Sequence, residues 1–370
     1  MSNNLKRKEI FAMATDPIYI GTGGYTIGRV DNTIVRDPIT NIPKIPGSSL
    51  AGTWRYYVTL DLINDIKDKK PDFKDKDCNN KSLKEKFEQC EWKEKPLKKW
   101  HEWKYNKISK ITCAGQDNTA NEILEKSNTA VDKNGNTGHC GYCIVCKAFG
   151  FAKKDISNQG MLFFSDLNIL FFPVFTYKGT KWITTKRIVE RIEFIDNKNS
   201  TSENKEYNKK ICFVFANFSE NEIEGHINLG WLYLPYKVDH ELKNNIERII
   251  EKLPYKLSLK DIIIVPEDLL SHIINSNLEV RTSVSIDPIT GAAKEGALFT
   301  SEAIPRGTIF YGEIRGFKRV DNDLPDLNLV FDALDDTKYY YETLGIGGMT
   351  TRGFGRLKIG NDLKIGDKNG

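Results

Sequence analysis

The stretch IPGSSLAGTWR at residues 45–55 is the most informative part of this 370-residue chain. Pro46-Gly47 breaks an extended segment, and Ser48-Ser49 then cap what the pattern predicts as a helix over about residues 50–62. Such a helix N-terminus binds anions through its unpaired amides and its dipole. Thr53 stands where a mononucleotide P-loop needs lysine, and no GxGxxG follows a strand, so both nucleotide-binding motifs are excluded.

A second glycine-rich segment, LGIGGMTTRGFGRLKI at 344–359, has the same character. Glycine lets the backbone reach positive φ and approach another chain closely, and arginine adds forked hydrogen bonds to phosphate. An ordinary glycine-rich hairpin that closes a sheet is the alternative. The candidate polyanion contacts in this segment are Gly347, Gly348, Thr350, Thr351, Arg352, Gly353 and Arg356. Because the two segments lie at opposite ends, we expect one domain, residues 1–370, with insertions.

Composition limits the class of protein. The formal charge is only +4 with a pI near 8.4, so attraction to a nucleic acid must come from local clusters of charge. Mean hydropathy is −0.45, and no apolar run approaches the roughly 18 residues of a membrane span. No secretory leader is visible at MSNNLKRKEI, so we expect a cytoplasmic protein without a membrane partner.

The hydrophobic pattern gives a coarse order of elements. Residues 63–148 read as an inserted lobe whose mixed charges surround Trp92, Trp100 and Trp103. Those tryptophans either pack the lobe onto the body or contact bases. The polar run 196–210 is expected to be a flexible insertion. We also expect strands at 9–20, 161–175 (a pair) and 211–218, helices at 239–253 and 268–276, and a hairpin at 279–304 around the turn sequence DPITG.

Three of the seven cysteines form one array, Cys140-x2-Cys143-x2-Cys146. This spacing lets thiolates reach one tetrahedral zinc ion, with Cys113 as the expected fourth ligand and His139 as the alternative. An iron–sulfur cluster is possible, although the CP pair that usually follows is absent. The set leaves no open position, so we expect a structural metal. The remaining cysteines, Cys78, Cys90 and Cys212, are expected to be free thiols.

Asp31 is the carboxylate of most interest, since it follows the glycine loop at 21–28. Beside a bound phosphate it could bind Mg²⁺ or accept a proton, or it could simply cap a turn. Asp16 and Asp37 each precede proline, which favours a turn role for those two. The five histidines show no metalloprotease spacing.

IPGSSLAGTWR resembles the IPGSS signature of CRISPR-associated RAMP proteins, and GGMTTRGFGR resembles their C-terminal glycine-rich loop. The context before IPGSS, the CxxC array, SDLNILFFPV and RTSVSIDPITGAAKEGALFTSEAIP occur in the order found in backbone subunits of type III effector complexes. The resemblance covers most of the chain apart from the 67–112 and 196–210 insertions.

This resemblance implies an α+β fold, with a modified ferredoxin-like (RRM-type) palm, an inserted helical zinc-binding lobe and the 279–304 hairpin as a projecting thumb. It implies a guide-RNA-binding subunit that stacks with copies of itself and other type III subunits, and that cleaves complementary single-stranded target RNA at regular intervals. Asp31 matches the family's catalytic aspartate, with Mg²⁺ or another divalent cation assisting. Further guide-RNA contacts would be Lys44, Gly47, Ser48, Ser49, Arg55 and Arg281.

Two departures bear on this reading. Ala51 stands where the signature often has lysine, and the lobe insertion is larger than a minimal subunit needs. A structural RNA-binding subunit without nuclease activity is the alternative. A guide-processing endonuclease would use a histidine near the N-terminus, and none precedes His101. The subtype stays open, because the N-terminal context suits III-A subunits and the middle motifs suit III-B subunits.

Overall fold

The computed structural model describes residues 4–23, 30–68, 98–104, 106, 109–115, 139–153, 156–196, 211–215, 224–320, 323–360 and 363. The predictions for Trp92, Cys78, Cys90 and residues 197–210 concern residues outside this part of the chain. Within it, no helix has the length and apolar character needed to cross a membrane.

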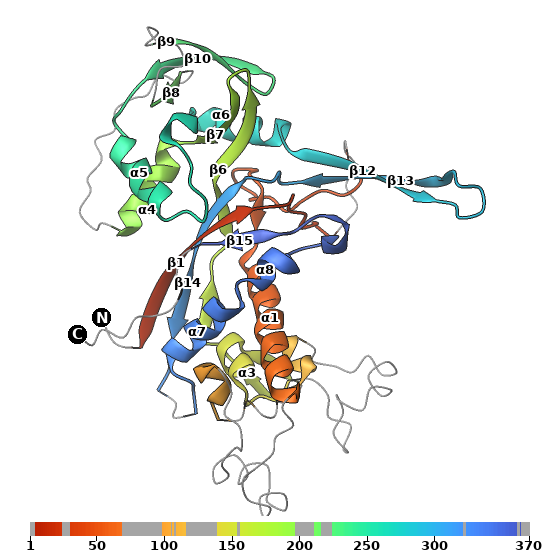
Figure 1. The fold of residues 1–370 in the computed structure, drawn as a ribbon. Helices are drawn as coiled ribbons and strands as arrows, with labels where there is room; N and C mark the ends of the chain where they lie inside the picture. The colour runs from red at the N-terminus through yellow and green to blue at the C-terminus, as the bar shows by residue number, and fades with distance from the viewer. Residues whose placement is uncertain are drawn as a thin grey trace, which may run out of the picture.

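A mixed sheet forms the centre of the molecule, with eleven strands among the described residues (Figure 1). The long antiparallel pair β1–β14 runs from Leu5↔Phe317 to Met13↔Ile309. Ile10 and Ala12 face one hydrophobic cluster, whereas Phe11 between them faces another, as the two-residue period of a strand requires. The sheet order is β15 (Leu357–Ile359), β1 (Leu5–Ala14), β14 (Ile309–Phe317), β6 (Leu167–Thr176), β7 (Gly179–Thr184), β11 (Ile262–Ile264), β8 (Cys212–Val214), β10 (Leu232–Val238) and β9 (Glu224–Leu229), with β2 (Lys44–Ile45) paired to β6 and β5 (Leu162–Phe164) paired to β14.

Helix α1 (Gly47–Asp68) crosses one side of this sheet and is longer at both ends than the predicted 50–62. Its buried face repeats at helical spacing through Leu50, Trp54, Val58 and Leu62. The Trp54 indole donates to the Leu334 carbonyl at 3.1 Å. That bond joins α1 to α7 (Leu327–Thr337), and α8 (Tyr340–Thr343) follows directly.

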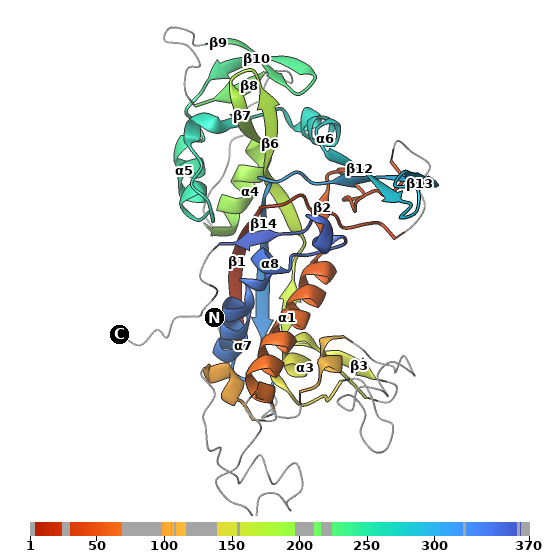
Figure 2. The ribbon, with the colours of Figure 1, turned by 45° about the vertical axis from the view of Figure 1, so that its right-hand side comes forward.

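The predicted lobe surrounds the far end of α1 (Figure 2). Its described parts include two 3₁₀ turns, Lys99–Glu102 and Ile111–Ala114, and most of the helix α3 (Ile144–Phe149). The short pair β3 (Phe151–Lys153) and β4 (Ile156–Asn158) follows just beyond the predicted boundary at residue 148. Trp100 is buried, and its indole donates to Asp336 at 3.1 Å. For Trp100, therefore, packing onto the body is confirmed over contact with bases.

The opposite end carries the second hydrophobic cluster. Helices α4 (Lys186–Asp196) and α5 (Lys243–Glu251) cover β6, β7 and β11 there, and α6 (Glu267–Ser276) leads into the hairpin (Figure 1). The predicted helix at 239–253 is thus shorter than expected.

The expected hairpin is confirmed as β12 (Glu279–Ile286) and β13 (Ala293–Ala303), and it projects from the body (Figures 1 and 2). The Asp287 carboxylate accepts the amides of Ile289 and Thr290, and Gly291 takes a φ of 66°. The DPITG sequence therefore forms the turn that its residues predict.

Other boundaries differ from the prediction. The opening strand spans 5–14 rather than 9–20, because residues 17–20 leave β1 and Ile18 bridges Ile304 instead. The run 161–175 does contain two strands, but β5 pairs with β14 and not with β6. A mixed α/β architecture is confirmed, whereas the ferredoxin-like form of the palm stays a prediction.

Candidate nucleic-acid interface and metal centre

The C-terminal glycine-rich loop packs against the segment that follows β1. The Gly348 amide donates to the Tyr19 carbonyl at 2.9 Å, and the Gly355 amide donates to the Pro17 carbonyl at 2.8 Å. Gly347 has a φ of 84°, and a Cβ there would lie 2.2 Å from the Tyr19 oxygen. Glycine is therefore required at 347 by the fold itself.

The outer part of this loop points away from the body. Thr350–Arg352 form a 3₁₀ turn between two left-handed residues, Met349 and Gly353. Thr351 and Arg352 are exposed, and within the described chain the Arg352 guanidinium has no hydrogen-bond or ion-pair partner. Arg356 is half-exposed and lies 3.3 Å from the Asp16 carboxylate. The loop therefore presents cationic and hydroxyl groups to solvent.

Arg281 joins strand β12 to the same loop. Its Nη1 donates to the Gly353 carbonyl at 3.1 Å, and its guanidinium lies 4.6 Å from the Phe354 ring centroid. It also pairs with Glu279 at 2.5 Å. Arg281 thus adds positive charge where the hairpin meets the loop.

Strand β13 contacts the predicted catalytic residue. The exposed Asp31 carboxylate accepts from Thr300 twice through Oδ2, from the amide at 2.7 Å and from Oγ1 at 2.9 Å. These two donors hold the pKa of Asp31 below its usual range. Asp37 differs, because its carboxylate accepts the amides of Ile39 and Thr40 in its own turn. The turn role predicted for Asp37 is confirmed, whereas Asp31 bonds across to the hairpin.

The N-terminus of α1 is occupied from within the protein. The Gly47 amide donates to Asp166 Oδ1 at 2.8 Å, and Lys44 Nζ lies 2.6 Å from Asp166 Oδ2. Burial alone would raise the pKa of Asp166, but these partners outweigh it and the pKa lies below its usual value. A Cβ at Gly47 would lie 2.7 Å from the Phe164 carbonyl oxygen. Lys44 and Gly47 therefore stabilise the start of α1. Within the first turn of this helix, Ser48 is the residue that is exposed to solvent.

Arg55 points into the lobe rather than toward the hairpin. Its guanidinium donates to the carbonyls of Cys113 at 2.6 Å and Gly150 at 2.7 Å, and to His139 Nδ1 at 2.8 Å. Since guanidinium only donates, His139 Nδ1 is the acceptor. Acceptors within the protein thus bind all three guanidinium nitrogens, Nε, Nη1 and Nη2. Arg55 is therefore not part of the proposed RNA surface.

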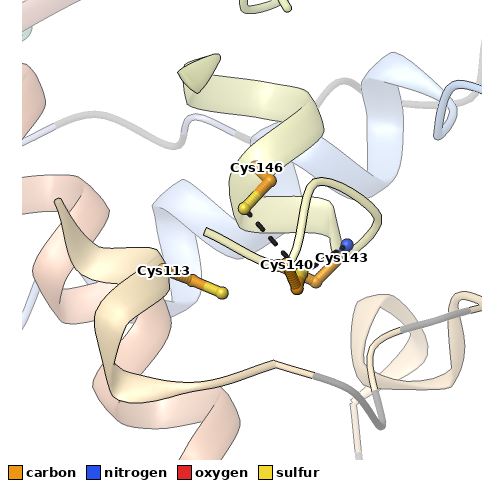
Figure 3. A group of neighbouring side chains, drawn as sticks. All are labelled: Cys113, Cys140, Cys143 and Cys146. Atoms are coloured by element: carbon orange, nitrogen blue, oxygen red, sulfur yellow. Dashed lines mark hydrogen bonds between the residues drawn. The ribbon is translucent and has the colours of Figure 1, made fainter. Parts of the chain in front are cut away.

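Arg55 donates to the backbone of one member of a cysteine cluster, Cys113. Figure 3 shows the four cysteine side chains of this cluster. The sulfur atoms of Cys113, Cys140, Cys143 and Cys146 all lie within 4.8 Å of one another, and those of Cys140 and Cys146 are 3.9 Å apart. His139 is not part of this set. Four thiols from two separate segments therefore form a site that could hold a metal ion such as zinc. Cys113, which we expected as the fourth ligand, is one of the four.

The surroundings of the sulfurs suit thiolates bound to a cation. Burial raises the pKa of the Cys143 thiol, so ionisation there needs a nearby positive charge. Backbone amides point at the others: those of Cys143 and Tyr142 donate to Cys140 Sγ at 3.3 and 3.4 Å, and that of Lys110 donates to Cys113 Sγ at 3.4 Å. Cys212 lies apart as a free buried thiol whose pKa burial raises to about 12.

Three residues of the site have no signal in the sequence. Asp166 caps α1 from 119 positions away, and Thr300 contacts Asp31 across 269 positions. Glu302 pairs with Arg36 at 2.6 Å in the same region. Only the fold brings these partners together.

The chain belongs to the RAMP superfamily, whose family model matches residues 12–358. Over 227 residues it is 27% identical to the CRISPR system Cmr endoribonuclease Cmr4 of Pyrococcus furiosus, a match that covers 58% of this chain and 74% of that protein. A 36-residue stretch is 53% identical to the CRISPR system Cms endoribonuclease Csm3 of Methanothermobacter thermautotrophicus and covers 10% of this chain and 15% of that one.

Solved structures share the fold over nearly the full length. A chain of the type III-B Cmr-beta complex bound to cognate target RNA, seen by cryo-electron microscopy, superimposes with a TM-score of 0.53 at 12% identity, over 96% of both chains. The crystal structure of oligomeric Cmr4 from Pyrococcus furiosus gives 0.51 at 17% identity, over 96% of this chain and 99% of that chain.

Proposed function

We propose that this chain is a guide-RNA-binding backbone subunit of a type III CRISPR effector complex, and that it cleaves complementary target RNA with Asp31. The single observation that carries the proposal is the meeting of Asp31 and the 344–359 loop at the base of one projecting hairpin. Asp31 bonds to β13, and the 344–359 loop bonds to β12 through Arg281. The likeness to an endoribonuclease of a CRISPR system supports the same assignment.

The 344–359 loop supplies the proposed guide contacts. Arg352 and Thr351 are exposed, and Arg281 lies next to them. Forked guanidinium groups and hydroxyls bind phosphate oxygens without reading base identity. A subunit that holds a guide of any sequence needs contacts of this kind, and Gly347, Gly348, Thr350, Gly353 and Arg356 shape the same surface.

The proposed cleavage is an in-line attack within the target RNA. A ribose 2′-hydroxyl gives its proton to solvent water and attacks the adjacent phosphorus, the P–O5′ bond breaks, and the departing 5′-oxygen takes up a proton from water. The products are a cyclic phosphate and a 5′-hydroxyl. Stacked A-form RNA does not allow this alignment, so a projecting hairpin that splays one nucleotide would promote it.

Asp31 fits the role of a permanently ionised group. Its pKa is lowered by the two Thr300 donors, so it stays a carboxylate at neutral pH but is a weak base. A divalent cation such as Mg²⁺ would offset the charge of the phosphate. In this proposal the ion would be bound through the Asp31 carboxylate and the substrate phosphate.

We further propose that the four cysteines hold one structural zinc ion. A tetrahedral ion with Zn–S bonds of about 2.3 Å separates its sulfurs by about 3.8 Å, close to the 3.9 Å between Cys140 and Cys146. In a [4Fe–4S] cluster each thiolate binds a different iron, and in a [2Fe–2S] cluster each iron binds only two of the four thiolates, so the four sulfurs lie farther apart than around a single ion. Four protein ligands leave no open position, so the ion would join the Cys113 segment to the 140–146 segment and take no part in cleavage.

The test of the proposed function is Asp31→Ala in the effector complex, assembled with guide RNA and a complementary target. We expect target binding to persist and cleavage to fall at least about 10²-fold. Asp37→Ala is the matched control, because Asp37 lies on the same segment, caps its own turn and pairs with Lys44 rather than with the hairpin. Unchanged cutting by Asp31→Ala would leave the second candidate, a structural RNA-binding subunit without nuclease activity.

A further inference from the structure

We infer that Thr300 is a positioning residue for Asp31, so that strand β13 of the hairpin sets the orientation of the catalytic carboxylate. The inference rests on the proposed function and deepens it, since it couples the hairpin to the cleavage site.

The contact between the two residues is reciprocal. The Thr300 amide and hydroxyl converge on Asp31 Oδ2 at 2.7 and 2.9 Å, and the Asp31 amide approaches Thr300 Oγ1 at 3.1 Å. Because both donors bind Oδ2, they fix the rotation of the carboxylate, and neither of them binds Oδ1. An exposed aspartate on a loop would otherwise sample several rotamers. Thr300 therefore selects the direction in which Oδ1 points.

The loop and the strand also share backbone bonds. The Asn32 amide donates to the Thr300 carbonyl at 3.0 Å, and the Glu302 amide donates to the Asn32 carbonyl at 3.0 Å. Farther along, Arg36 pairs with Glu302 at 2.6 Å and donates to Asn275 on α6 at 3.0 Å. Residues 31–36 are thus bonded to the base of β13 at several points.

The consequence is mechanical coupling. When RNA seats against the projecting hairpin, any shift at the base of β13 carries Thr300, and Asp31 moves with it. The lowered pKa of Asp31 has the same origin, because both Thr300 donors stabilise the ionised form. Orientation and ionisation of Asp31 therefore depend on one side chain that comes from the hairpin.

The experiment compares Thr300→Val with Thr300→Ser in the complete effector complex. Valine keeps the shape of threonine and the backbone amide but removes Oγ1, whereas serine keeps the hydroxyl. We expect Thr300→Val to slow target cleavage about tenfold with guide binding unchanged, and Thr300→Ser to return to within about twofold of the wild type. Thr282→Val is the control, since Thr282 is the exposed cross-strand partner of Thr300 on β12.

The pH profile separates positioning from a general structural effect. Removing a donor to the ionised form raises the pKa of Asp31, so the acid limb of the cleavage profile should move to higher pH in Thr300→Val. If Asp31→Ala is inactive but Thr300→Val cuts like the wild type at every pH, the positioning role is wrong and the proposed function stands. If Asp31→Ala cuts normally, the proposed function fails and the positioning role fails with it.

Discussion

The two glycine-rich segments contain the same residue types but use them differently. In the N-terminal segment, Lys44, the Gly47 amide and Arg55 all bond within the protein. In the C-terminal segment, Thr351 and Arg352 face solvent. A cation beside a glycine turn therefore indicates a phosphate contact only where acceptors within the protein do not already satisfy it. One segment supports the fold, and the other presents the cation and hydroxyl of our proposed RNA contacts to solvent.

The largest effect should come from the metal centre that Arg55 adjoins. Cys143→Ser should release the ion and lower the free energy of unfolding by roughly 5 kcal/mol, less than the roughly 10–16 kcal/mol of isolated zinc-finger peptides, because the lobe also packs on α1. Metal analysis should fall from about one zinc per chain to none, and thermal unfolding should shift. Cys212→Ala is the control and should keep its zinc. Full zinc content in Cys143→Ser would contradict the ligand set.

Arg55→Ala tests whether the N-terminal segment supports the fold rather than RNA binding. It leaves the Cys113 and Gly150 carbonyls without their donor, so we expect a loss of about 3 kcal/mol in the free energy of unfolding. RNA affinity of the folded fraction should not change. Chemical denaturation and filter binding measure the two quantities. A loss of affinity without a loss of stability would return Arg55 to the RNA surface.

Arg352→Ala tests the C-terminal segment and should have the smallest effect on stability, within about 0.5 kcal/mol. Guide affinity should fall equally for guides of different sequence, and the slope of log affinity against log salt should decrease by about one unit. Titrations of two unrelated guides at several salt concentrations measure this. A loss confined to one guide sequence would indicate base reading instead of phosphate binding.

The sequence predicted the parts whose signals are local. The two short cysteine spacings, the DPITG turn and the helix after Pro46 depend on residues within a few positions of one another. The structure brings Cys113 together with the other three cysteines, whereas the spacing alone left the fourth position open to His139. Family resemblance supplied the candidate role of Asp31, which no local pattern distinguishes from a turn.

What the sequence could not predict depends on contacts between distant segments. Nothing near Gly47 indicates that Asp166 reaches its amide, and nothing near Asp31 indicates Thr300. The same holds for β5, whose apolar run predicts a strand but does not choose β14 over β6 as its partner. Pairing of this kind is decided by tertiary packing, and intrinsic strand preference is too weak to fix it.

The cysteine cluster also sets where this chain can change in length. Cys113 and Cys140 meet in one cluster although residues 114–139 separate them. With the ends of that stretch fixed, each doubling of its length costs only about 0.6 kcal/mol of loop-closure entropy. Relatives could therefore gain or lose much of this stretch with little effect on folding and none on the hairpin base. The lobe is a place where subunits of one family can diverge in size, and so in the neighbours they meet, while the proposed cleavage site stays the same.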